Sequence, residues 1–205
     1  MTLPRPFSAF SNQSGALFGL DARIALAIFG ILSVVAGVSI VTSIDGTRGQ
    51  VLATELADTA QALESFHHDL KTDIFLSLET PTEKGAFQAL FDNSVIRTGD
   101  NLQARWNGPY IKASSNLHPR YGAMTLTKAG PVHSSPCIPS ELCYLYVVYS
   151  NVKMDIAKKA NEVLDGEAET DAGAEGRLQW SRGEEGTNLR VYFRAIRALS
   201  NDMDY

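Results

Sequence analysis

The sequence has few of the features that mark the commonest functional classes. It contains no dense block of lysine and arginine, and its formal net charge is −5. Nucleic-acid binding therefore lacks bulk electrostatic support, because that binding depends on neutralising phosphates. The short signatures of serine hydrolases, P-loop proteins, zinc peptidases and dinucleotide-binding enzymes are also missing. We expect no enzymatic activity, no cofactor and no nucleic-acid partner.

Cysteine is almost absent, since Cys137 and Cys143 are the only two. They bracket a short loop, CIPSELC, ahead of an apolar run. No further cysteine or nearby histidine pair completes a four-ligand metal site, which disfavours a metal. Two thiols this close indicate a disulfide if the domain is exported, whereas a cytosolic protein would keep them free.

Charge is absent from one long segment, residues 24–44 (IALAIFGILSVVAGVSIVTSI), which has 21 residues. As a helix it would be roughly 31 Å long, close to the ~30 Å hydrocarbon core of a bilayer. A buried helix of a soluble protein usually shows a polar face, and no small-residue cleavage motif follows the run. We predict a retained transmembrane anchor. Arg5 and Arg23 before the run, against Arg48 after it, weakly favour a cytoplasmic N-terminus.

A helical pattern continues beyond the apolar run. Apolar residues recur three or four positions apart and form one stripe, which predicts a helix from near Leu20 to about Phe75 with this stripe on a folded domain. The stripe comprises Leu52, Leu56, Thr59, Leu63, Phe66, Leu70 and Ile74. Later segments predict strands at 123–128, 142–149, 177–182 and 189–196, of which the last two form a hairpin, and helices at 84–91 and 153–164. One helix on a small antiparallel sheet is an α+β fold.

The segment LFGLDARIALAIFGIL, residues 17–32, resembles the start of type IV pilins and of type II secretion pseudopilins. In those families a short leader is cut before a pattern like F-T-L-I-E, which precedes an apolar run containing A-I-I-G-I-L. With Asp21 at the acidic position, AIFGIL (27–32) aligns without a gap, and the cut would fall between Ala16 and Leu17. The sequence departs from the pattern in three ways: alanine precedes the cut, aspartate replaces glutamate, and Arg23 stands where these families are usually apolar. A cut after Gly15 is the alternative, and it would move Asp21 one place out of register.

A short motif, WNGPYI, follows the predicted long helix. It comprises Trp106, Asn107, Gly108, Pro109, Tyr110 and Ile111. By itself, the Gly-Pro-Tyr part is typical of a turn covered by an aromatic ring. The motif resembles the W-x-G-P-Y-L that the major pseudopilins of type II secretion carry after their long helix.

The resemblance implies three parts: a leader (1–16) removed by a prepilin peptidase, a transmembrane and assembly half of the helix (17–45), and a periplasmic pilin-like domain (46–205). The cleaved N-terminus would be methylated. The expected function is a structural subunit of a type IV pilus-like filament or of a type II secretion pseudopilus, hence a role in protein transport. The implied partners are copies of the chain, other pilin-like subunits, the inner-membrane assembly platform and, before assembly, the lipid bilayer.

Asp21 has a specific role under this resemblance. It would meet the free amine of Leu17 in an adjacent subunit, whereas the alternatives are a headgroup-level carboxylate or a local pair with Arg23. An unpaired charge in an apolar filament is costly, which favours the assembly role. Gly30 and Gly37 would let helices approach closely, although they also suit ordinary helix packing.

The resemblance also implies that a late acidic loop could hold calcium, an ion that prefers oxygen ligands. The spacing matches no known site, and a mobile solvated loop is the favoured alternative. The candidate ligands are Asp165, Glu167, Glu169 and Asp171.

We expect a single-pass inner-membrane protein whose C-terminal domain is periplasmic, and periplasmic or extracellular within a filament. Two other functions stay open. One is a membrane-anchored binding module that does not polymerise, and the other is an anchored periplasmic enzyme whose site the sequence does not reveal.

Overall fold

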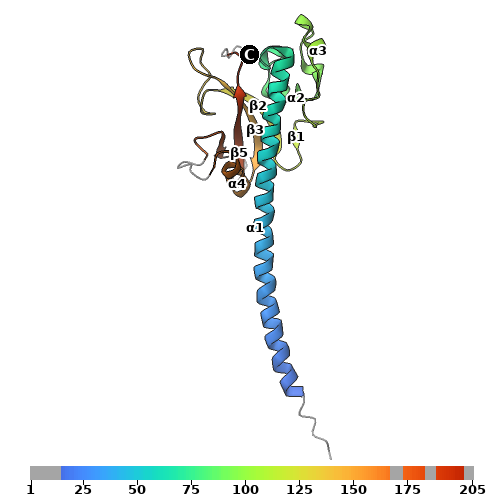
Figure 1. The fold of residues 1–205 in the computed structure, drawn as a ribbon, viewed down its shortest axis with the longest axis vertical. Coiled ribbons are helices and arrows are strands. Elements are labelled where there is room, and N and C mark those ends of the chain that lie inside the picture. Colours follow the sequence, from blue (N-terminus) through green and yellow to red (C-terminus); the bar gives the residue numbers. More distant parts are fainter. Residues whose placement is uncertain (1–14, 167–172, 183–187, 201–205) are drawn as a thin grey trace, which may run out of the picture. The chain divides into compact units, whose positions relative to one another are not determined.

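A computed structural model describes residues 15–166, 173–182 and 188–200 (Figure 1). The chain divides into two compact units, residues 1–44 and 45–205. Helix α1 (Gly15–Leu70) begins in the first unit and ends in the second.

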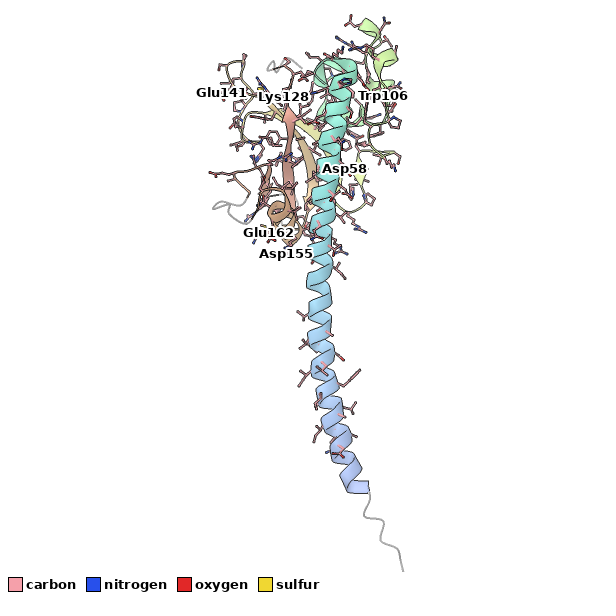
Figure 2. All side chains as sticks on the ribbon, in the orientation of Figure 1. Asp58, Trp106, Lys128, Glu141, Asp155 and Glu162 are labelled. Atoms are coloured by element: carbon pink, nitrogen blue, oxygen red, sulfur yellow. A yellow bond between two sulfur atoms is a disulfide. The ribbon has the colours of Figure 1, made fainter. Side chains whose placement is uncertain are left out.

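The described part of the first unit is helical and presents apolar side chains outward (Figure 2). The segment Asp21–Val38 is long and apolar enough to cross a membrane or to act as a signal segment, and none of it is buried. Phe29 and Leu26, for example, are each 70% exposed. The surface of this helix therefore has no covering within the described residues.

The second unit is built on a five-stranded antiparallel sheet with the order β1-β2-β3-β5-β4. The strands are β1 (Leu117–His118), β2 (Gly122–Ala129), β3 (Tyr144–Val152), β4 (Leu178–Arg182) and β5 (Leu189–Arg197). Strands β2 to β5 match the four predicted strands within a few residues. Strand β1 was not predicted, because two residues are too few to show a period. The α+β prediction is confirmed.

Short helices complete the second unit. They are α2 (Glu83–Gln88), α3 (Leu102–Arg105), α4 (Met154–Leu164) and 3₁₀ turns at Phe75–Ser77, Asn93–Val95 and Gly99–Asn101. Helices α2 and α4 correspond to the predicted segments 84–91 and 153–164. The prediction that the long helix extends to Phe75 is wrong. It ends at Leu70 because Lys71 adopts a left-handed backbone, φ 54°, which is a common way to terminate a helix.

The core lies between the second-unit part of α1 and one face of the sheet (Figure 1). All seven residues of the predicted stripe are buried, and Leu56, Leu63, Phe66 and Leu70 are 0% exposed. Cross-strand pairing puts Leu126, Val147, Phe193 and Leu178 in one row on the sheet, and all four belong to the same core cluster as the stripe. The helical period thus predicted the buried face of α1 correctly.

The predicted disulfide is present. Cys137 and Cys143, with Cα atoms 5.4 Å apart, join the β2–β3 loop to the residue that precedes β3. Both cysteines are buried, and the Cys143 carbonyl accepts a hydrogen bond from the Ala198 amide at 2.9 Å. The bridge therefore anchors the loop beside the chain that leaves β5.

Removing this bridge should destabilise the second unit modestly. Closing so short a loop contributes about 2 kcal/mol on the loop-entropy model. We expect the Cys137→Ala/Cys143→Ala protein to unfold roughly 4–8 °C below the wild type, as a domain of this size loses about 2–4 °C per kcal/mol. Thermal unfolding measures this, and alkylation of the native protein is the control. Two thiols that react fully without reductant would contradict the bridge.

Candidate functional site

The residues linked by resemblance to processing and assembly lie at the start of α1. The backbone of Ala16 and Leu17 is helical, and their side chains fall outside the described part. Asp21 and Arg23 are both exposed, and no ion pair joins them in the part of the chain that the structure describes. A local pair with Arg23 therefore does not account for Asp21 in the isolated chain.

No contact within the described residues requires glycine at positions 30 and 37. A Cβ built at either position meets nothing within 4 Å. Glycine inside a helix costs roughly 0.5–1 kcal/mol relative to alanine. The described residues therefore leave the space beside both glycines open.

The Trp-Asn-Gly-Pro-Tyr motif folds into a lid over the end of α1 (Trp106 is labelled in Figure 2). The Tyr110 hydroxyl donates a hydrogen bond to Asp69 of α1 at 2.9 Å, and the Asn107 amide donates to that hydroxyl at 3.0 Å. Burial, chiefly, raises the pKa of Tyr110 to about 12, so this hydroxyl remains a donor at neutral pH. The Trp106 ring meets the Tyr110 ring edge-on, with centroids 5.6 Å apart.

Glycine is required at the centre of this lid. A Cβ on Gly108 would lie 2.4 Å from the Trp106 ring, which packs directly over it. The following peptide, Gly108–Pro109, is cis. The indole N–H donates to the Ala89 carbonyl at 2.8 Å, so the ring cannot simply move aside. The motif is a structural closure of the domain at the end of α1.

The calcium candidates are only partly described. Asp165 accepts hydrogen bonds from the backbone amides of Arg177 and Leu178, at 2.9 and 2.8 Å, and so anchors the start of β4. The other three, Glu167, Glu169 and Asp171, lie outside the described residues. Among the described residues, no group of three histidine, cysteine or acidic side chains is placed to hold a metal ion.

A groove of about 450 Å³ runs beside α1, and its lining includes Glu55, Tyr149 and His118. The His118 Nδ1 accepts hydrogen bonds from the backbone amides of Arg120 and Tyr121, both at 3.1 Å. The other ring nitrogen, Nε2, lies 3.5 Å from the Glu55 carboxylate. Both nitrogens therefore contact groups of the fold, and His118 acts as a brace for the β1–β2 turn.

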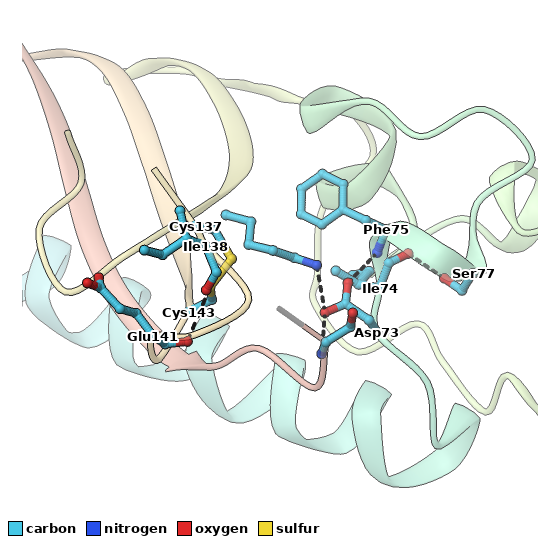
Figure 3. A network of polar contacts seen from close by, with 10 residues as sticks. Asp73, Ile74, Phe75, Ser77, Cys137, Ile138, Glu141 and Cys143 are labelled. Atoms are coloured by element: carbon cyan, nitrogen blue, oxygen red, sulfur yellow. Dashed lines mark hydrogen bonds and ion pairs between the residues drawn. A yellow bond between two sulfur atoms is a disulfide. The ribbon is translucent and has the colours of Figure 1, made fainter. Parts of the chain in front are cut away.

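A buried ion pair that the sequence patterns did not predict joins Asp73 and Lys128 (Figure 3). The two charged atoms are 3.1 Å apart, and the side chains are 0% and 1% exposed. Asp73 also accepts hydrogen bonds from the backbone amides of Phe75 and Ser200, at 3.0 and 3.3 Å. The pair thus joins the turn after α1, strand β2 and the chain after β5.

The alternation of side chains along β2 would have indicated a buried lysine at position 128. Side chains alternate between the two faces of a strand, so Lys128 shares a face with the buried residues Met124 and Leu126. A lysine on the buried face requires an acidic partner. Period-2 alternation therefore predicts a buried charge, although it does not identify Asp73 as the partner.

His67 lies close to this pair and is nearly buried, with 9% exposure. Its Nε2 has no hydrogen-bond partner among the described residues. Burial lowers the pKa of His67 below its ordinary value; Asp73 partly opposes this effect and Lys128 adds to it. The folded domain therefore favours a neutral His67.

This pKa shift predicts an acid-sensitive contribution to stability. Because the pKa is lower in the folded state, the unfolded chain binds the proton first. The contribution of His67 to the free energy of unfolding is fully present above the pKa of the unfolded state, about 6.5, and it is lost as pH falls through the lower pKa of the folded state. We expect His67→Gln to flatten the fall in melting temperature between about pH 7 and pH 5. His68→Gln is the matched control, because that neighbouring side chain is 86% exposed. Equal pH profiles for both variants would contradict this role of His67.

Comparison of the chain with protein-family models, curated proteins and solved structures finds no match. The fold alone places the chain in a broad class of proteins, those with an α+β domain that follows an exposed apolar helix. This arrangement is compatible with the architecture of pilins.

Proposed function

We propose that this chain is a structural subunit of a type IV pilus-like filament or of a type II secretion pseudopilus. The observation that supports this most is the exposed apolar surface of residues 21–38, which the described chain leaves uncovered. In water such a surface is unfavourable, whereas lipid or neighbouring apolar helices would cover it. A filament subunit uses both coverings in turn, lipid before assembly and helices afterwards.

Two further features agree with this function. Gly30 and Gly37 leave room for a neighbouring helix, since small residues allow backbones to approach closely. The Cys137–Cys143 bridge fits a domain that is exported to an oxidising compartment. The proposed location is the inner membrane, with residues 46–205 in the periplasm.

The proposed partners follow from the same function. A prepilin peptidase would remove residues 1–16, and an inner-membrane platform would extract the anchored subunit. Copies of the chain and other pilin-like subunits would then surround residues 17–45. Because the apolar contacts are non-directional, Asp21 would provide the register between subunits.

The mature N-terminus tests this proposal. We expect mass spectrometry of the protein from its native envelope to show Leu17 as the first residue, with a methylated amine. The same chain in cells that lack the peptidase is the control and should retain Met1. An intact Met1 in native cells, or a cut after Ile44, would reject the filament-subunit proposal.

A further inference from the structure

A pocket in the second unit is lined by cationic side chains. Its volume is about 220 Å³, and no carboxylate lines it. The positive charges come from three separate elements: α1, the β1–β2 turn and the residue before α4. The lining residues are Arg48, Arg120, Tyr121, Asn151, Lys153 and Ile156.

These cations are only partly neutralised. Arg48 forms an ion pair with Asp45 at 3.1 Å, using one of its guanidinium nitrogens. Arg120 and Lys153 are exposed and form no ion pair with any described residue. The acidic groups outside the lining are Asp45, which pairs with Arg48, Asp155 in the first turn of α4, and Glu55, which acts electrostatically on Tyr121. The lining itself thus carries only positive charge.

The chemistry of the lining suits a phosphate group. Guanidinium groups donate paired hydrogen bonds to phosphate oxygens, and lysine adds a mobile point charge. Lys153 is also the N-cap of α4, an 11-residue helix whose first turn has no side-chain cap from this residue. The positive end of the helix dipole adds to the attraction for an anion.

The position of Arg48 in the chain indicates the source of such a phosphate. It follows Ile44, the end of the uncharged run, by four residues. Four residues span at most about 14 Å whatever their conformation. If the apolar run spans a bilayer, Arg48 must lie at or near the phospholipid headgroups.

We propose that this basic pocket binds the headgroup phosphate of an anionic phospholipid from the membrane that anchors the chain. The inference rests on the membrane anchoring given under Proposed function and goes beyond it by assigning a lipid ligand. The bound lipid would hold the second unit to the membrane surface before assembly. Extraction of the subunit would then have to break this contact.

Thermal unfolding of the full chain in a neutral detergent tests the proposal. The probes are short-chain phosphatidylglycerol, short-chain phosphatidylcholine and inorganic phosphate at equal concentrations. We expect phosphatidylglycerol to raise the melting temperature by about 3 °C when it is well above its dissociation constant. The Arg120→Gln/Lys153→Gln protein should lose this shift.

A second double variant, Lys71→Gln/Arg197→Gln, is the matched control. It removes the same charge, and both residues are exposed. Lys71 lies beyond the end of α1, 23 residues from Arg48, and Arg197 pairs with Tyr144 at the end of β3 away from Asn151. This control should keep the full shift caused by phosphatidylglycerol.

The proposal is overturned if phosphatidylcholine stabilises the protein equally, or if both double variants lose the shift to the same extent. An equal effect of inorganic phosphate would identify a free-phosphate site and reject the lipid assignment. An intact Met1 on the chain from native cells would instead contradict the proposed function. If the chain is anchored in the membrane but phosphatidylglycerol and phosphatidylcholine stabilise it equally, the lipid site is rejected and the proposed function is not affected.

Discussion

Replacing Lys128 by methionine is expected to lower the free energy of unfolding by about 3–5 kcal/mol, the cost of breaking a buried ion pair from one side. The Asp73 carboxylate would remain buried without its cation, although it would still accept hydrogen bonds from the backbone amides of Phe75 and Ser200. Methionine fills a similar volume, so little of the loss would come from a cavity. Thermal or urea unfolding of the full chain in detergent measures the change.

Two controls separate lost charge from lost packing. Lys128→Met combined with Asp73→Asn removes both charges and should be more stable than Lys128→Met alone, because no unpaired charge stays buried. Lys112→Met, at an exposed lysine, should change stability by no more than about 0.5 kcal/mol. A Lys128→Met protein as stable as the Lys112→Met control would contradict the importance of the pair.

Replacing Asp21 by alanine is expected to reduce filament assembly by about 100-fold or more while leaving the second unit unchanged. The proposed partner of Asp21 is the amine of a neighbouring subunit, so the interaction exists only in the filament. Its loss would leave that amine buried and unpaired, which costs a few kcal/mol, and each 1.4 kcal/mol is a factor of about ten. Sheared-filament yield measures assembly, and the melting temperature measures folding.

Asp21→Glu is the matched control, because it keeps the charge and restores the residue typical of the resembling families. It should assemble, whereas Asp21→Ala should not. Unchanged assembly by Asp21→Ala would reject the role of this carboxylate and favour an anchored binding module that does not polymerise. A large loss of melting temperature would show instead that Asp21 serves the fold.

Local patterns in the sequence predicted the main elements correctly. Apolar spacing along α1 predicted that residues such as Leu56 and Leu63 are buried, because the side chains of a helix return to the same face every three or four residues. Strand-like runs predicted β2 to β5, and the clearest was that of β3, which is rich in valine and aromatic residues. The six-residue separation of Cys137 and Cys143 left them close enough to pair.

What depends on distant residues could not be predicted in this way. The predicted hairpin of β4 and β5 is present, but β5 also pairs with β3, which is distant in the sequence, and the local period of a strand does not identify such a neighbour.

By itself, the sequence determined the apolar run, the buried stripe of α1, the strands and the proximity of the two thiols, because each depends on residues a few positions apart. Only the tertiary structure decided that Asp73 meets Lys128 and that Arg48, Arg120 and Lys153 line one pocket. The physical reason is that these side chains come together only when the packing of α1 and the sheet brings distant parts of the chain side by side.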